Sequence, residues 1–242
     1  MFRRIAFTAM LAGFLGGLFI SVVQEFTTTP IILHAEKFES GGAPDGHKHS
    51  HATSRNPLLH LAQARDVPPA EPEGWAPADG FERTLYTTMA NVIAGVGFAL
   101  ILVGCVAISG RTVDGRTGVL WGIAGFTVFN LATSLGLPPE VPGAMAADLV
   151  PRQGWWFLCA LATAAGLWLL VFRRGAPWIA LGLFLLVLPH VIGAPQPTQI
   201  GGKVPPELAG HFVAASLVTA AIFWTVLGWL SGTFWRRFEA KA

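Results

Sequence analysis

The sequence predicts an all-α integral membrane protein with about six transmembrane helices. Of the 242 residues, 52% are hydrophobic and only 12% are charged, and the mean hydropathy is +0.54. Soluble domains carry roughly 25% charged residues, so this chain has about half the usual share. The charged residues are also grouped between long apolar runs, which is the pattern of a chain that crosses the bilayer repeatedly. The net charge of +2 is too small to indicate a nucleic-acid partner.

A transmembrane helix needs roughly 17–25 predominantly apolar residues. Six segments meet this requirement, and we expect them to form helical hairpins: Ile5–Val23, Tyr86–Ser109, Gly118–Gly136, Gly154–Phe172, Pro177–Gly193 and Phe212–Ser231. The fifth segment is short and contains Pro189. Five spans would result if the first segment were cleaved as a signal peptide or the fifth did not cross. Because no small-x-small cleavage motif follows the first segment, we expect it to be retained as an anchor.

The chain is divided into three parts by this pattern. Residues 1–25 form the first transmembrane helix, and residues 86–242 form a five-helix membrane domain with two short Pro-Pro-Glu loops. Residues 26–85 connect them as a long loop that is rich in Pro, Gly, Ala and charge. Because this loop has no sustained hydrophobic period, we expect much of it to be irregular.

The basic residues predict the orientation, because Lys and Arg are enriched near the cytoplasmic ends of spans. With six spans, nine of them fall on one side of the membrane: Arg3, Arg4, Arg111, Arg116, Arg173, Arg174, Arg236, Arg237 and Lys241. The two short loops on the other side, 137–153 and 194–210, contain only Arg152 and Lys203. Both termini are therefore expected in the cytoplasm, and the long loop is expected outside.

The long loop contains a tract of alternate histidines, His47, His49 and His51. Imidazole suits borderline divalent metals such as cobalt, nickel, copper and zinc, and a flexible histidine tract binds them without a preformed cage. The alternatives are a solvated loop with incidental histidines or an expression tag, although Lys48 and Ser50 between the histidines disfavour a tag. Three of the seven histidines lie within five residues, which favours metal capture.

The two short outer loops share a Pro-Pro-Glu pattern at residues 138–140 and 205–207. The similarity predicts duplicated hairpins, with spans three and four resembling spans five and six. Proline preorganises the first turn of a helix, and glutamate suits its positive dipole end. We therefore expect the pattern to start helices, with Glu140 and Glu207 as candidate cation ligands in addition.

The second of these loops adds histidines to its glutamate. Glu207 and His211 are four residues apart, so they share one face at the start of the sixth span. His190 lies near the outer end of the fifth span beside Pro189, and a hairpin is expected to bring the three together. Carboxylate and imidazole are suitable ligands for a divalent cation. For His190 the alternative is a bond to a carbonyl freed by the proline kink.

A weaker pair of candidates lies where the long loop leaves the membrane. His34 and Glu36 would share a face if this stretch were extended. The alternative is an ordinary solvated acidic stretch.

The predicted membrane interior carries small polar residues, such as Asn130 and Thr219, but no Asp, Glu, Lys or Arg near the middle of any span. Small polar residues usually serve helix packing, whereas proton-coupled pumps use an intramembrane carboxylate or histidine relay. The sequence also has no Gly-x-x-x-x-Gly-Lys-Ser/Thr loop for ATP. An ion-transporting role would therefore imply a partner or self-association.

The same residues carry a family resemblance along nearly the whole chain. Its motifs are Pro30-Ile31-Ile32 to Ala35-Glu36, the histidine tract, Trp75-x-Pro77-x-Asp79-Gly80, Leu120-Trp121-Gly122, Gly136-Leu137-Pro138-Pro139-Glu140, Arg152-Gln153-x-Trp155-Trp156, His190-x-x-Gly193-Ala194-Pro195, Pro205-Pro206-Glu207-Leu208-Ala209 and Phe223-Trp224. The chain resembles the CbtA family, the predicted cobalt transporter subunit of bacteria. The resemblance implies cobalt uptake linked to cobalamin synthesis and a small, His-rich, single-span partner, CbtB. The family is usually described with five spans, one fewer than the apolar segments of this chain.

These observations favour a subunit of a cobalt (or nickel) uptake transporter in the bacterial inner membrane, which captures the ion on the periplasmic face and passes it inward. No resident cofactor is expected, and self-association into a homo-oligomer is compatible with the sequence. The competing hypotheses are a membrane metal-binding or sensor protein that transports nothing, and a purely structural membrane subunit. An enzyme is disfavoured because the chain has no His-Glu-x-x-His, no Gly-x-Ser-x-Gly and no paired carboxylates at membrane depth.

Overall fold

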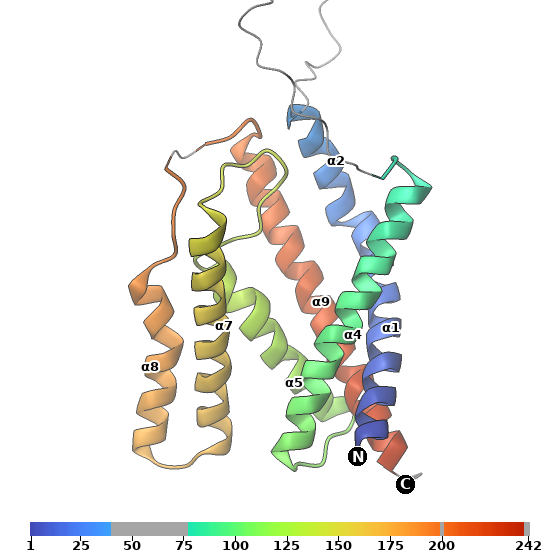
Figure 1. Ribbon diagram of the computed structural model, residues 1–242, viewed down its shortest axis with the longest axis vertical. Coiled ribbons are helices and arrows are strands. Elements are labelled where there is room, and N and C mark those ends of the chain that lie inside the picture. Colours follow the sequence, from blue (N-terminus) through green and yellow to red (C-terminus); the bar gives the residue numbers. More distant parts are fainter. Residues whose placement is uncertain (40–76, 199–200, 240–242) are drawn as a thin grey trace, which may run out of the picture.

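The computed structural model describes residues 1–39, 77–198 and 201–239 (Figure 1). Within these ranges the regular structure is helical: α1 (Phe2–Phe26), α2 (Thr28–Glu39), α4 (Phe81–Ser109), α5 (Gly115–Phe126), the π-helical turn η1 (Thr127–Leu131), α6 (Ala132–Ser134), α7 (Leu149–Phe172), α8 (Ala176–Ile192) and α9 (Pro206–Glu239). The all-α prediction is therefore confirmed for the described residues.

Four helices, α1, α4, α7 and α9, are long and apolar enough to cross a membrane. They correspond to predicted spans one, two, four and six. The third predicted span is helical over 20 consecutive residues, 115–134, but η1 divides it between α5 and α6. The fifth corresponds to α8, an apolar helix of 17 residues that contains Pro189. The count of six spans stays a prediction.

The long loop is more ordered at its start than its composition predicts. Residues 28–39 form α2, which continues the direction of α1 beyond Thr27 (Figure 1). Ile31 and Ala35 are buried on one side of this helix, and α2 packs against α9 as well as α1. A buried apolar pair four residues apart stabilises a helix through tertiary packing.

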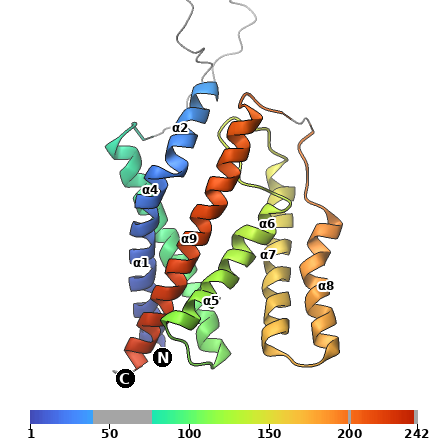
Figure 2. The same cartoon turned by 180° about the vertical axis from the view of Figure 1, so that it is seen from behind.

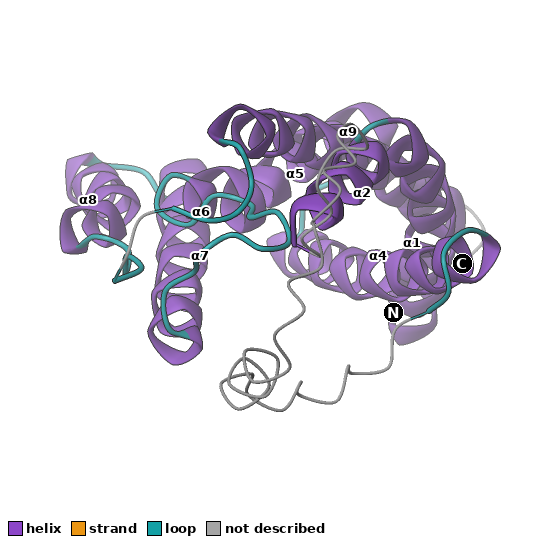
Figure 3. Ribbon diagram, turned by 90° about the horizontal axis from the view of Figure 1, so that it is seen from above, coloured by secondary structure: helices purple, strands orange, loops and turns teal. Residues whose placement is uncertain are grey.

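The predicted hairpin of spans five and six is wrong as a packing unit, because α8 and α9 are not a main packed pair of the described residues, whereas spans three and four do contact each other where η1 and α6 pack against α7. The main helix pairs are α1 with α4, α5 with α9, and α7 with α8, and α9 also packs along α1 (Figure 2). Seen from above, the α7–α8 pair lies to one side of the unit formed by α1, α4, α5 and α9 (Figure 3). Between the chain neighbours α8 and α9, residues 193–198 and 201–205 are non-helical, and this separation allows α9 to pack on distant partners.

Glycines create the close approach of these pairs. A Cβ atom on Gly122 of α5 would lie 2.1 Å from the Trp224 carbonyl oxygen of α9, and one on Gly118 would lie 2.3 Å from the Gly228 oxygen. The α1–α4 pair is similar, because a Cβ on Gly13 would lie 2.4 Å from the Val96 Cα. In lipid there is no hydrophobic force between helices, so close backbone packing at small residues drives their association.

The core between α4, α9 and the π-helical turn is aromatic. Trp224 is buried, stacks on Phe129 at a ring distance of 5.5 Å, and contacts Phe98 at 5.0 Å. Its Nε1–H donates to the Asn130 side-chain oxygen at 2.7 Å. This bond satisfies both polar groups inside the bundle, so Asn130 has the packing role that its sequence position predicts.

The start of α1 and the end of α9 lie at the same end of the bundle, opposite the end from which α2 extends (Figure 1). Arg4 connects the two terminal helices there, because its guanidinium donates to the Trp235 carbonyl oxygen at 2.7 Å and lies 3.7 Å from that ring. Asp114 caps α5 at this end. Hydrogen bonds from the backbone N–H and hydroxyl of Thr117, helped by Arg236, hold the pKa of the Asp114 carboxyl below its usual range.

Candidate functional site at the outer end of the helices

The outer end is defined here as the end opposite the start of α1 and the end of α9. It carries α2, the start of α4, the loop 135–148 between α6 and α7, and the start of α9 (Figure 1). The segment 40–76 connects α2 to the start of α4 at this end. The predicted metal ligands His47, His49 and His51 belong to that segment and lie outside the described residues.

An ion pair joins the two helices that flank this segment. The Arg83 guanidinium of α4 donates to both carboxylate oxygens of Glu36 in α2, at 2.5 and 2.9 Å. A second carboxylate, Asp79, lies 3.3 Å from the same guanidinium. Bidentate pairing of this kind is both stronger and more directional than a single contact. Because both Glu36 oxygens accept hydrogen bonds from Arg83, this predicted metal ligand instead connects α2 to α4.

We expect substitution of either partner to weaken this junction modestly. Glu36→Gln and Arg83→Gln should each cost up to about 1 kcal/mol, since both side chains are partly exposed. The exchanged double variant, Glu36→Arg with Arg83→Glu, should recover most of the loss of melting temperature. Asp79→Asn is the matched control, because its side chain is 85% exposed.

A metal-ligand role for Glu36 predicts a different pattern of results. Glu36→Gln would then lower cobalt affinity more than Arg83→Gln does, and the exchanged variant would not recover it. Melting curves and cobalt titrations of the same purified variants separate the two roles.

Polar side chains whose pairing the sequence did not predict also connect α1 to α4 near this ion pair. The Asn91 amide donates to Gln24 Oε1 at 2.6 Å and to Ser21 Oγ at 3.1 Å. Thr84 donates its hydroxyl to Glu25 at 3.0 Å. Their partners are 59 to 70 residues apart in sequence, so no local motif indicates them. They satisfy the polar groups on the facing sides of both helices.

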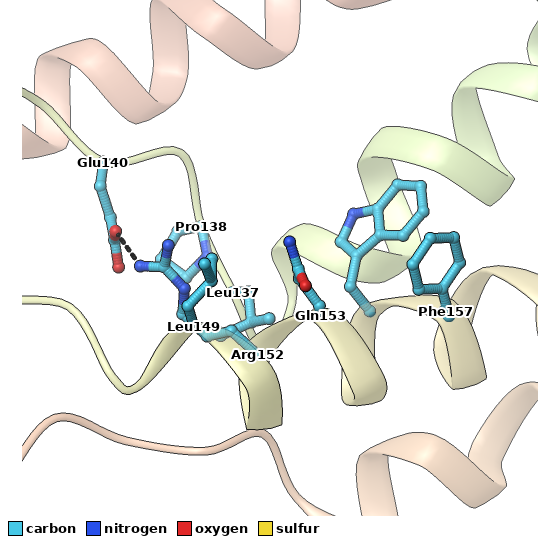
Figure 4. A pocket seen from close by; sticks show the side chains of 8 residues that line it. Leu137, Pro138, Glu140, Leu149, Arg152, Gln153 and Phe157 are labelled. Atoms are coloured by element: carbon cyan, nitrogen blue, oxygen red, sulfur yellow. Dashed lines mark hydrogen bonds and ion pairs between the residues drawn. The ribbon is translucent and has the colours of Figure 1, made fainter.

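The first Pro-Pro-Glu loop forms a cavity of about 480 Å³ with the start of α7 (Figure 4). Arg152 of α7 lines this cavity and donates to Glu140 at 2.8 Å. Figure 4 shows this pair at one end of the cavity, with Gln153 and Phe157 further along α7. Like Glu36, the predicted ligand Glu140 is therefore paired with an arginine.

The two outer loops contact each other through one antiparallel bridge between Ala144 and Gly202. Only the second Pro-Pro-Glu copy starts a helix, since α9 begins at Pro206. In the first copy this prediction is wrong, because residues 137–148 are non-helical and α7 begins at Leu149. The Glu140–Arg152 pair and the bridge hold the first loop across the end of α7 instead.

Glu207 and His211 lie in the first two turns of α9, on one face as predicted, and both are exposed. His190 is placed differently. Its ring meets Trp155 of α7 edge-on at 6.0 Å, where the Trp155 Nε1–H donates to the Pro189 carbonyl at 3.0 Å. His190 is therefore part of the packing between α7 and α8.

His190 was expected to lie together with Glu207 and His211, and the structure does not show this arrangement. Residues 1–39, 77–198 and 201–239 contain no group of three His, Cys, Asp or Glu side chains placed to hold a metal ion. His34 is exposed on α2, where its ring packs against Phe38 at 5.5 Å. Because α2 is helical, His34 and Glu36 do not share a face.

Comparison with known protein families gives a match over nearly the whole chain. A family model described as "Probable cobalt transporter subunit (CbtA)" matches residues 2–236. The chain belongs to the CbtA family. The resemblance seen in the motifs is therefore confirmed across both the transmembrane helices and the outer loops. No curated protein and no solved structure matches the chain.

Membership of the CbtA family indicates which ion and which kind of complex the outer end has to be compared with. The family is described as a transporter subunit, and the four long apolar helices are those of a membrane protein. Cobalt is thus the ion associated with the family, and "subunit" denotes one component of a transporter complex. Of the three carboxylates predicted as ligands at the described outer end, Glu36 and Glu140 are paired with arginines, whereas Glu207 is exposed at the start of α9.

Proposed function

We propose that this protein is the membrane subunit of a cobalt uptake transporter, with nickel as the alternative ion, and that it captures the cation on the periplasmic face of the bacterial inner membrane and passes it inward. The observation that carries the proposal is the CbtA family match over residues 2–236. Transport also fits a chain in which apolar helices occupy most of the residues.

The proposed topology places both termini in the cytoplasm. It is supported by the nine basic residues expected at the cytoplasmic side and by the position of the start of α1 and the end of α9 at one end of the bundle. The segment 40–76 connects to the opposite end (Figure 1). This orientation directs the histidine tract toward the periplasm, where external cobalt arrives.

Capture is proposed to begin at His47, His49 and His51 and to continue at Glu207 and His211. Imidazole and carboxylate are suitable ligands for a borderline divalent cation. Glu207 and His211 are exposed at the outer end of α9, so an ion released by the tract can reach them. His190, His34, Glu36 and Glu140 remain weaker proposals, because packing or ion pairing already accounts for the positions of most of them.

The inward path is proposed to require a partner, because the chain has no charged residue near the middle of a predicted span. A small, His-rich, single-span subunit of the CbtB type is the proposed partner. A homo-oligomer is a second arrangement that would supply an interface for the path. Large hydrophobic side chains exposed along the helices, such as Phe184 and Ile93, support contact with lipid or other membrane helices.

Cobalt uptake in cells that express this chain with and without its small neighbour tests the proposal. We expect cobalt accumulation to rise above the background only when the chain is present, and most when both are. Within that assay, Glu207→Ala and His211→Ala should each lower uptake at low external cobalt. Glu82→Ala, at an exposed position in the first turn of α4, is the matched control. If neither substitution changes uptake, the proposed second step of capture is wrong.

The alternative functions give different results in reconstituted vesicles. A sensor or metal-binding protein would bind cobalt yet produce no flux, with or without the partner. A structural subunit would show no dependence on metal at all.

A further inference from the structure

A cavity of about 780 Å³ lies between α4, α5 and α7, away from the outer end. Its wall is apolar along most of its length and includes Leu102 from α4, Leu120 from α5, Val128 from the π-helical turn, and Ala164 and Leu167 from α7. The proposed transport function does not use this cavity.

The cavity results from the way the third helical segment crosses the bundle. α7 packs against η1 and α6, whereas the main partner of α5 is α9. Figure 2 shows α5 diverging from α7 toward the end that carries the termini. The gap therefore opens in the half of the bundle nearest the termini, which the proposed topology places in the cytoplasmic leaflet.

A single arginine lines the cavity at this end. Arg111, in the loop between α4 and α5, lies with its guanidinium carbon 4.6 Å from the Phe172 ring of α7. None of the ion pairs found among the described residues includes Arg111. The nearby acid, Asp114, is occupied by Thr117 and Arg236. The cavity thus has an apolar body and a cationic mouth.

We propose that this cavity binds an anionic phospholipid of the leaflet at the terminal end, with its phosphate on Arg111 and an acyl chain against the wall formed by α4, α5 and α7. A guanidinium pairs well with phosphate, and basic pockets between membrane helices on the cytoplasmic side bind anionic headgroups. A transmembrane helix about 10 Å wide and 30 Å long occupies on the order of 2,000 Å³. The cavity is too small to enclose such a helix, whereas an acyl chain is narrow and flexible.

Native mass spectrometry of the full-length protein tests the proposal. The protein is reconstituted in nanodiscs with equal amounts of phosphatidylglycerol and phosphatidylcholine, released, and scored for each bound lipid. We expect retained phosphatidylglycerol in the unmodified protein. Arg111→Gln should lower the preference for phosphatidylglycerol about fivefold, which corresponds to the attraction of one basic residue to an anionic surface. Arg111→Lys should retain it, and Arg237→Gln, at an exposed position in the last turn of α9, is the control.

A second pair of variants tests the acyl chain. Ala164→Trp fills the cavity and should reduce the retained lipid, whereas Ala165→Trp, on an exposed neighbouring position outside the cavity wall, should not. Equal retention by both tryptophan variants, or by Arg111→Gln and Arg237→Gln, would overturn the proposal and indicate non-specific annular lipid. Loss of a co-purified small subunit from Ala164→Trp, with lipid retention unchanged, would overturn it in favour of a protein helix at this position.

Discussion

Gly122→Ala is expected to separate α5 from α9 and to destabilise the folded protein. The added Cβ would lie 2.1 Å from the Trp224 carbonyl oxygen and 3.2 Å from the Gly228 Cα. Both atoms belong to the backbone of α9, so no side chain can rotate away and the helices themselves have to move. Overpacking of this kind costs roughly 1–3 kcal/mol. In a chain of 242 residues, each kcal/mol corresponds to a loss of about 2–4 °C in melting temperature.

Gly97→Ala is the matched control, because it makes the same chemical change in a helix where nothing lies within 4 Å of the new Cβ. Alanine favours a helix over glycine by about 1 kcal/mol, so this variant should melt at the same temperature or higher. Fluorescence-detected melting of both variants in detergent measures the difference. Equal melting temperatures would contradict the close packing of α5 on α9.

Replacing His47, His49 and His51 together with alanine is expected to reduce cobalt uptake at low external concentration. Removing even an outer-shell partner of a metal site costs about 10–100-fold in affinity, so removing three imidazole ligands should raise the half-saturating cobalt concentration by at least roughly tenfold. The rate at saturating cobalt should change little, because the tract captures the ion and does not form the path.

Initial uptake rates across a cobalt series, measured by elemental mass spectrometry, separate these two effects. His60→Ala is the matched control, since it removes a lone histidine from the same segment. A lower saturating rate with an unchanged half-saturating concentration would contradict capture and indicate a role in the path. An unchanged curve would leave the histidines without a role in uptake.

The apolar segments predicted most of the helices because the bilayer imposes a simple requirement. A chain in lipid has to satisfy its backbone hydrogen bonds internally, so a long apolar run becomes a helix. Thus Gly154–Phe172 was predicted and α7 spans Leu149–Phe172. Hydropathy underestimates the length of a helix where polar residues continue it beyond the apolar run. An example is α9, which begins six residues before the predicted span.

The candidate site was less predictable than the helices. The sequence placed Glu36 and Glu140 correctly at the outer end, but not their arginine partners, which are 47 and 12 residues away. The convergence of His190 with Glu207 and His211 depended on a hairpin of α8 and α9. Since α9 packs on α5 and α1 instead, His190 does not join the α9 pair, and its ring contacts Trp155 of α7.

The sequence by itself determined that this is a helical membrane protein of the CbtA family, and it predicted correctly that Glu36, Glu140 and Glu207 lie at the end of the helices opposite the start of α1. Hydropathy and metal-ligand chemistry are properties of single residue types, so the sequence gives them without any knowledge of which residues are neighbours in space. Only the tertiary structure decided which helices pair. In lipid most faces of a helix are apolar, so the pattern does not mark the contact face. Close backbone contacts at Gly118, Gly122 and Gly228 select the partner, and those contacts exist only when both helices are in place.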